Sequence, residues 1–185
     1  MEEGTFHEDK FFSILGIIGP LIAYTCIGLS VYLAPSFSWH VNALSDLGHA
    51  KDSIVASIFN FGLLISGFLV ALYSVKSLVN YAKYTGISLT LSALMLQAVA
   101  TFDEVYGQIH FIVSVLFFIS AGITCIIYFL EKKPILAALA FLVGLLAWVL
   151  WCAGVYKAGI AVPELISALA VTLCIIHSAI RAMWR

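Results

Sequence analysis

Residues 108–130 read QIHFIVSVLFFISAGITCIIYFL, a long apolar run. The run contains no Asp, Glu, Lys or Arg, and its single histidine is His110. A helix needs about 20 predominantly apolar residues to cross the hydrocarbon core of a bilayer. The run is continuously apolar and does not alternate with polar residues, so it does not fit a spanning β-strand. The stretch therefore predicts a transmembrane helix.

Five further stretches of this kind lie along the chain. Together the six predicted spans cover about residues 11–32, 53–75, 84–100, 108–130, 134–155 and 162–182. The 185-residue chain is 63% hydrophobic and 10% charged, whereas a soluble domain carries about 25% charged residues. The sequence predicts an all-α fold, a polytopic membrane bundle of six transmembrane helices that forms a single domain over residues 1–185.

The distribution of Lys and Arg predicts the orientation of the bundle, because these residues favour the cytoplasmic side of short loops. The predicted outer loops hold only Lys51 and Lys157, and the tails and the remaining loops hold Lys10, Lys76, Lys83, Lys132, Lys133, Arg181 and Arg185. We therefore expect a multi-pass protein of the cell membrane with both termini in the cytoplasm. The net charge of −1 and the lack of a basic run argue against a nucleic-acid partner.

The first predicted outer loop contains the sequence SFSWHVNALSDLGHA over residues 36–50. Asn42 is suited to cap a short helix, and Gly48 is suited to follow its last turn. Three apolar residues would give this helix a buried face, namely Val41, Leu44 and Leu47. The loop is therefore predicted to hold a short interfacial or re-entrant helix that lies over the bundle.

Polar and ionisable residues gather in and near the predicted outer loops, which indicates a site facing outside. Asp103 and Glu104 end the third span, and His110 begins the fourth. Asn60 and Gln97 lie inside spans, where a polar side chain must find a partner in the protein. We expect these two amides to floor a polar cup, although the same residues could serve only to join helices.

The residues of the first outer loop supply the chemistry of this predicted site. Ser45 and His49 share a face if the short helix continues past Gly48. Asp46 can brace the loop by bonding backbone N–H groups, and either Asp46 or Asp103 can join the histidines at a metal ion. Glu164 follows Pro163 at the start of the last span and is predicted to cap that helix.

Two functions remain open for these residues. In the first, the site binds or moves a small molecule, a lipid headgroup or an ion, with the bilayer as the other partner, and four residues bind the ligand, namely Asn42, Asn60, Gln97 and Asp103. In the second, the protein is an intramembrane zinc hydrolase or lipid-modifying enzyme, in which His49 and His110 hold the metal. The catalytic candidates are Ser45, Asp46 and Glu104, with Glu104 as a proton shuttle and Ser45 as a metal-free nucleophile. Haem bound by the same two histidines is disfavoured, because the loops offer only one such pair.

Several short motifs resemble a known family. These are FSWHVNALSDLG at residues 37–48, FNFG at residues 59–62, FDE at residues 102–104 and IHF at residues 109–111. They resemble the prokaryotic, largely archaeal membrane proteins grouped as domain of unknown function number 998. The resemblance implies about six spanning helices and an outer polar site, and it implies no reaction. By this resemblance, six residues fall on motif positions of the family, namely Asn42, Ser45, Asp46, Asn60, Asp103 and His110.

Overall fold

The computed structural model describes residues 2–184, with side chains described from residue 10 to residue 184. Every regular element in this range is helical. The long helices are α1 (Glu2–Leu33), α2 (Ala56–Tyr73), α4 (Lys83–Thr101), α5 (Gln108–Lys132), α6 (Ile135–Cys152) and α7 (Ala161–Met183). The short elements are the 3₁₀ helices η1 (Leu44–Gly48) and η3 (Glu104–Tyr106), the π-helical turn η2 (Ser74–Leu78) and α3 (Val79–Tyr81).

Six of the helical segments in the described part of the chain are long and apolar enough to cross a membrane, which confirms the predicted fold class. The second segment runs continuously from Ala56 to Tyr81 and includes α2, η2 and α3. Apolar side chains are exposed on the outside of the bundle, among them Phe11, Phe68 and Leu173. This surface is compatible with hydrocarbon and not with water.

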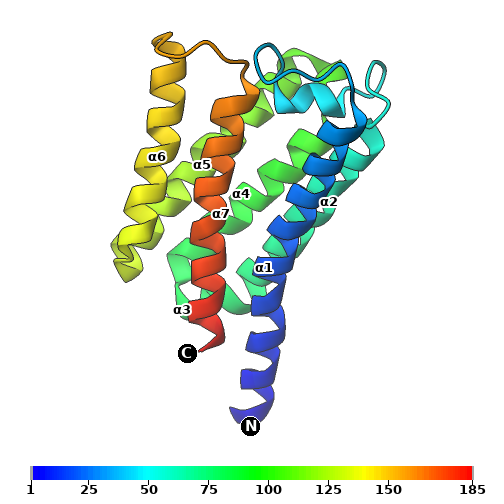
Figure 1. Ribbon diagram of the computed structural model, residues 1–185. Helices are drawn as coiled ribbons and strands as arrows, with labels where there is room; N and C mark the ends of the chain where they lie inside the picture. The colour runs from blue at the N-terminus through cyan, green and yellow to red at the C-terminus, as the bar shows by residue number, and fades with distance from the viewer. Residues whose placement is uncertain (1, 185) are drawn as a thin grey trace.

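The six spans form one bundle in which both chain ends lie at the same end (Figure 1). The short helices η1 and η3 lie at the opposite end, which we call the loop end. Helix α6 lies at the edge of the bundle, beside α5 and α7 (Figure 1). Basic side chains contact aromatic rings near the chain ends, since Lys10 Nζ lies 5.2 Å from the ring of Trp184 and Lys132 Nζ lies 4.5 Å from the ring of Tyr81.

Hydroxyl groups join the helices inside the bundle. Tyr73 of α2 bonds to Ser178 of α7 at 2.8 Å, and Tyr24 of α1 bonds to Thr172 of α7 at 3.1 Å. Because lipid offers no hydrogen-bond partner, such pairs satisfy polar groups and fix the mutual position of helices. Gly67 of α2 contributes differently, because its missing side chain lets α2 approach the backbone of α4.

The first long loop contains a short helix, as predicted, but its details differ from the prediction. Leu44 and Leu47 are buried, whereas Val41 is 78% exposed, so the predicted apolar face was wrong at Val41. Helix η1 begins only at Leu44, and the residue before it is Ala43, so Asn42 does not cap it. The chain turns through residues 38–42 before the helix starts, which points Val41 away from the bundle.

Candidate functional site at the loop end of the bundle

Asp46 and Asn42 shape the loop that carries η1. Asp46 Oδ2 accepts hydrogen bonds from Asn42 Nδ2 at 2.6 Å and from the backbone N–H of Ala43 at 3.1 Å. Asn42 Oδ1 accepts one from the backbone N–H of Ser38 at 2.9 Å. The two side chains therefore hold the chain in a fixed turn and place η1 over the ends of the spanning helices.

Glu164 links this loop to the last spanning helix. It lies in the first turn of α7, and its Oε2 accepts a 2.7 Å hydrogen bond from the backbone N–H of Leu44. Glu164 was predicted to cap its own helix. In the structure its carboxylate accepts a hydrogen bond from the first residue of η1, which is 120 residues away in the sequence. A contact over this distance has no signal in the local sequence.

Glu104 lies at the start of η3, close to the carboxyl groups of Asp46 and Glu164. Its Oε2 is buried and has no hydrogen-bond partner among the described residues. Burial is the largest effect that raises the pKa of the Glu104 carboxyl to about 7, and the hydrogen bond and negative charge of Asp46 act in the same direction. The hydroxyl of Ser45 has the opposite effect on this pKa. Glu104 is therefore an acid that can hold or release a proton near neutral pH.

His110 is the buried imidazole of the site, with 7% of its surface exposed. Its Nδ1 lies 2.7 Å from the carbonyl oxygen of Phe102, and its Nε2 lies 3.2 Å from Ser114 Oγ. The sequence prediction missed Ser114. The spacing of four residues within one helix was the signal that could have found it.

A cavity of about 810 Å³, which we call the lateral groove, lies between α5, α6 and α7. The polar residues of its lining gather towards the loop end, namely Ser45, Glu104, His110, Ser114, Glu164 and Ser167. Apolar residues, among them Phe111, Trp151 and Ile160, line the same end. The rest of the wall is apolar and includes Gly122, Phe141 and Trp148. Trp148 is held in place by a 3.3 Å bond from its Nε1 to Ser167 Oγ and by an edge contact with Phe118 at 5.3 Å between ring centres.

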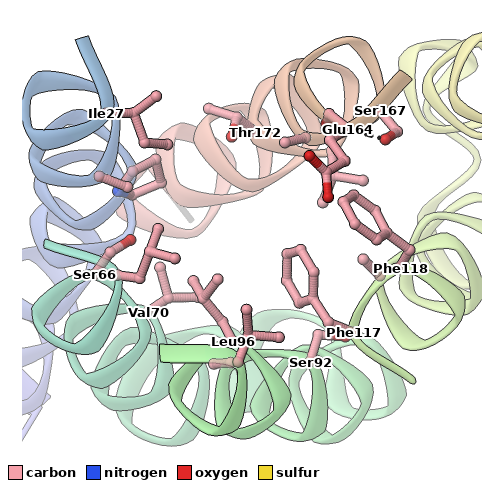
Figure 2. A pocket seen from close by; sticks show the side chains of 18 of the residues that line it. Ile27, Ser66, Val70, Ser92, Leu96, Phe117, Phe118, Glu164, Ser167 and Thr172 are labelled. Carbon is pink, nitrogen blue, oxygen red and sulfur yellow. Dashed lines mark hydrogen bonds between the residues drawn. The ribbon is translucent and has the colours of Figure 1, made fainter. Parts of the chain in front are cut away.

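A second cavity of about 130 Å³, the central chamber, lies in the middle of the bundle between α1, α2, α4, α5 and α7. Figure 2 shows Phe117 and Phe118 directed towards it from α5 and Glu164 directed towards it from α7. The two cavities have lining residues in common, namely Ser45, Ser114, Phe118, Glu164, Ser167 and Val171. Four polar residues of the lateral groove therefore line the central chamber as well, namely Ser45, Ser114, Glu164 and Ser167.

Three of the predicted binding residues make structural contacts away from the groove. Asn60 Nδ2 donates to the carbonyl of Gly48 at 2.8 Å and so ties α2 to η1. Gln97 Nε2 reaches the carbonyl of Ala93 in its own helix at 3.4 Å, and Asp103 Oδ1 accepts from the backbone of Val105 at 3.0 Å. None of the three lines the lateral groove or the central chamber, and Asn60 lines a separate cavity beside α2.

The two predicted metal ligands have different surroundings. His49 Nδ1 lies 3.2 Å from Asp52 Oδ2, and His49 does not line the cavity that contains His110. Among the described residues, no group of three or more His, Cys, Asp or Glu side chains is arranged to hold a metal ion. His49 and His110 therefore do not belong to a cluster of three or more such side chains in the described part of the chain.

The raised pKa of Glu104 predicts how stability depends on pH. The neutral carboxyl is favoured in the folded protein, so its contribution is complete below the ordinary pKa of 4.5 and is lost as the pH rises through about 7. We expect the melting temperature of the purified protein to fall between pH 5 and pH 8, by an amount equivalent to about 1–2 kcal/mol once partial exposure is allowed for. Thermal unfolding of wild type and Glu104→Gln measures this effect. A difference between the two proteins that stays constant across this range would contradict the prediction.

The comparisons with known proteins identify the family. The family model described as "Protein of unknown function (DUF998)" matches residues 17–181. No curated protein and no solved structure matches the chain. The matched range includes all of the residues that line the polar end of the lateral groove. Since the match covers nearly the whole chain, the protein belongs to the DUF998 family.

Proposed function

We propose that this protein binds an amphiphilic molecule within the membrane, with the apolar chain in the lateral groove and the polar head at the loop end. The observation that carries the proposal is the lining of one cavity of about 810 Å³, whose polar side chains gather towards the loop end and whose remaining lining is apolar. Ligand pockets are typically about 300–1,000 Å³ and mostly apolar with a few convergent polar groups. The volume of the lateral groove lies within this range, and its mostly apolar lining includes a few polar groups.

The position of the groove gives such a molecule a route from the bilayer. Groove residues on α5 are widely exposed, with Phe111 at 65%, Ile119 at 54% and Ile123 at 45%. Helix α6, which forms the other wall, lies at the edge of the bundle (Figure 1). A chain that enters sideways from the hydrocarbon stays in apolar surroundings throughout, so entry carries little desolvation cost.

The polar end of the groove favours a particular class of head. Two carboxyl groups, Glu104 and Glu164, and the hydroxyl of Ser45 face it, and the lining residues include neither Lys nor Arg. These groups accept hydrogen bonds and attract positive charge, whereas an anionic head would meet like charge without a counter-ion. The ligand class that fits best is therefore an amphiphile with a hydroxyl or amine head.

We extend the proposal to the orientation of the site. The basic residues of the tails and of the loops at the chain-terminal end favour the cytoplasm. The loop end, with its carboxyl groups, would then face the outside of the cell. The head of the ligand would lie near the outer membrane surface.

Titration of the protein in bilayer nanodiscs with three C12 amphiphiles tests the proposal. Trp148 and Trp151 line the lateral groove, so their fluorescence reports binding there. We expect dodecylamine and dodecanol to bind, and dodecylamine to bind at least about tenfold more tightly than dodecanoate, a difference of about 1.4 kcal/mol. Equal binding of all three would contradict the proposed head class. Absence of binding by all three would overturn the proposed function itself.

A further inference from the structure

We infer that Ser114 and His110 form a nucleophile and general-base pair that cleaves the ester bond of an amphiphile held in the lateral groove. The inference rests on the proposed function, because the groove must first hold such a molecule. Ser114 Oγ and His110 Nε2 are 3.2 Å apart. This separation is within the reach that activates a serine hydroxyl in enzymes that use covalent catalysis.

The second nitrogen of His110 fixes which form the imidazole takes. Nδ1 lies 2.7 Å from the carbonyl oxygen of Phe102, and a carbonyl can only accept a hydrogen bond. Nδ1 therefore carries the proton, and the lone pair of Nε2 in the neutral ring faces Ser114. An acceptor behind the ring that sets the tautomer is the third part of a serine–histidine arrangement. Here a backbone carbonyl takes the place that a carboxylate has in many hydrolases.

Ser114 is also placed where a bound ester would lie. It lines both the lateral groove and the central chamber, so a ligand in either cavity can reach it. Along α5 it is one helical turn further from the loop end than His110. A head beside Glu104 and Glu164 and a chain along α5 and α6 would put the ester between them, near Ser114.

The chemistry is a two-step hydrolysis with water as the second substrate. Ser114 Oγ forms a bond to the carbonyl carbon while its proton moves to His110 Nε2. The bond between the carbonyl carbon and the alcohol oxygen then breaks, and the alcohol leaves with the proton from Nε2. Water loses a proton to Nε2 and attacks the acyl-serine, which releases the carboxylic acid and returns the proton to Ser114. Nothing is oxidised or reduced.

Glu104 can assist from the same groove. Its buried Oε2 has no hydrogen-bond partner among the described residues. The ionised carboxylate attracts a cationic head, and the protonated carboxyl donates a hydrogen bond to the oxygen that becomes negative when Ser114 attacks. Because the groove favours a neutral or cationic head, no anionic head group competes for the hydrogen bond that the protonated Glu104 carboxyl donates.

A decyl fluorophosphonate tests the inference, because it forms a stable phosphoester with an activated serine and releases fluoride. We expect one adduct by intact mass, mapped to Ser114, in wild type and in the control Ser120→Ala, which changes a serine of α5 that lines neither cavity. Ser114→Ala should give no adduct. His110→Gln should react at least about 100-fold more slowly, since general-base catalysis contributes about 10²–10⁴, and its melting curve shows whether it folds.

The outcomes separate this inference from the proposed function. If dodecylamine binds to the nanodisc protein and no serine is labelled, the groove holds amphiphiles and the hydrolytic role is wrong. Labelling at another serine, or a labelling rate that His110→Gln leaves unchanged in folded protein, would also overturn the role of the pair. If no amphiphile binds and no serine is labelled, the proposed function and this inference are both wrong.

Discussion

Gly122→Leu is expected to weaken the binding of dodecylamine by at least about tenfold. Gly122 lies on the α5 wall of the lateral groove, opposite α6. A Cβ atom there would be 3.6 Å from the ring of Phe141, which is an ordinary contact, so the backbone has no reason to move. The remaining atoms of a leucine side chain would occupy the space assigned to the ligand chain. The nanodisc titration measures the loss.

Gly28→Leu is the matched control for this change. Gly28 lies in the last two turns of α1, and a Cβ atom at this position would have no neighbour within 4 Å. The substitution adds the same side chain to a spanning helix away from the groove. We expect wild-type affinity in this variant, and equal binding by both variants would show that the ligand does not use the groove.

Gly67→Val is expected to reduce the free energy of unfolding by about 2–3 kcal/mol, because overpacking a close helix contact costs about this much. A Cβ atom at Gly67 would lie 2.9 Å from the carbonyl oxygen of Ala93 and 2.7 Å from Cγ of Gln97. The Gln97 side chain can turn aside, but the Ala93 carbonyl belongs to the backbone of α4. Helices α2 and α4 would therefore have to separate.

Unfolding of the purified protein in mixed micelles by heat or denaturant measures this effect. Gly28→Val is the control, since it introduces the same β-branched residue into a spanning helix where nothing lies within 4 Å. We expect the control to stay within about 0.5 kcal/mol of wild type, as is usual for surface substitutions. A similar loss in both variants would mean that helix propensity, and not the α2–α4 contact, sets the cost.

The fold could be predicted from the sequence because a single physical requirement determines it. Backbone polar groups in hydrocarbon must be satisfied within the segment, so each long apolar run has to be a helix. The apolar run at residues 108–130 lies within α5, Gln108–Lys132. The detail of the first loop was harder, because Val41, Leu44 and Leu47 have helical spacing although the helix starts only at Leu44.

The candidate site was predictable where its residues are unusual for a membrane helix or loop. Ser45, Glu104 and His110 were identified from the sequence, and the structure places all three on the lining of the lateral groove. Ser114 was missed because one serine in an apolar helix is typical of helix packing. Glu164 was assigned to its own helix, because its contact with Leu44 depends on how the first long loop and the start of α7 meet.

His49 shows how the local backbone decides a site. The sequence predicted that Ser45 and His49 share a face if the short helix continues past Gly48, and it left open whether they meet if the helix breaks there. In the structure η1 ends at Gly48, and the next residue is extended, with φ −67° and ψ 104°. His49 then faces Asp52, three residues along the chain, at 3.2 Å. Asn60 has the linking role that the sequence also allowed, because it bonds to Gly48.

Photocrosslinking in a bilayer tests the central claim, that an amphiphile occupies the lateral groove, most directly. A dodecylamine derivative with a diazirine at the chain end would be irradiated with the protein, and the labelled peptides would be identified by mass spectrometry. The account predicts crosslinks concentrated on groove residues within 119–126 of α5 and 140–145 of α6, on the side away from the loop end, and suppressed by excess plain dodecylamine. Crosslinks spread evenly over all lipid-exposed helices, α1 included, and insensitive to competition would contradict it.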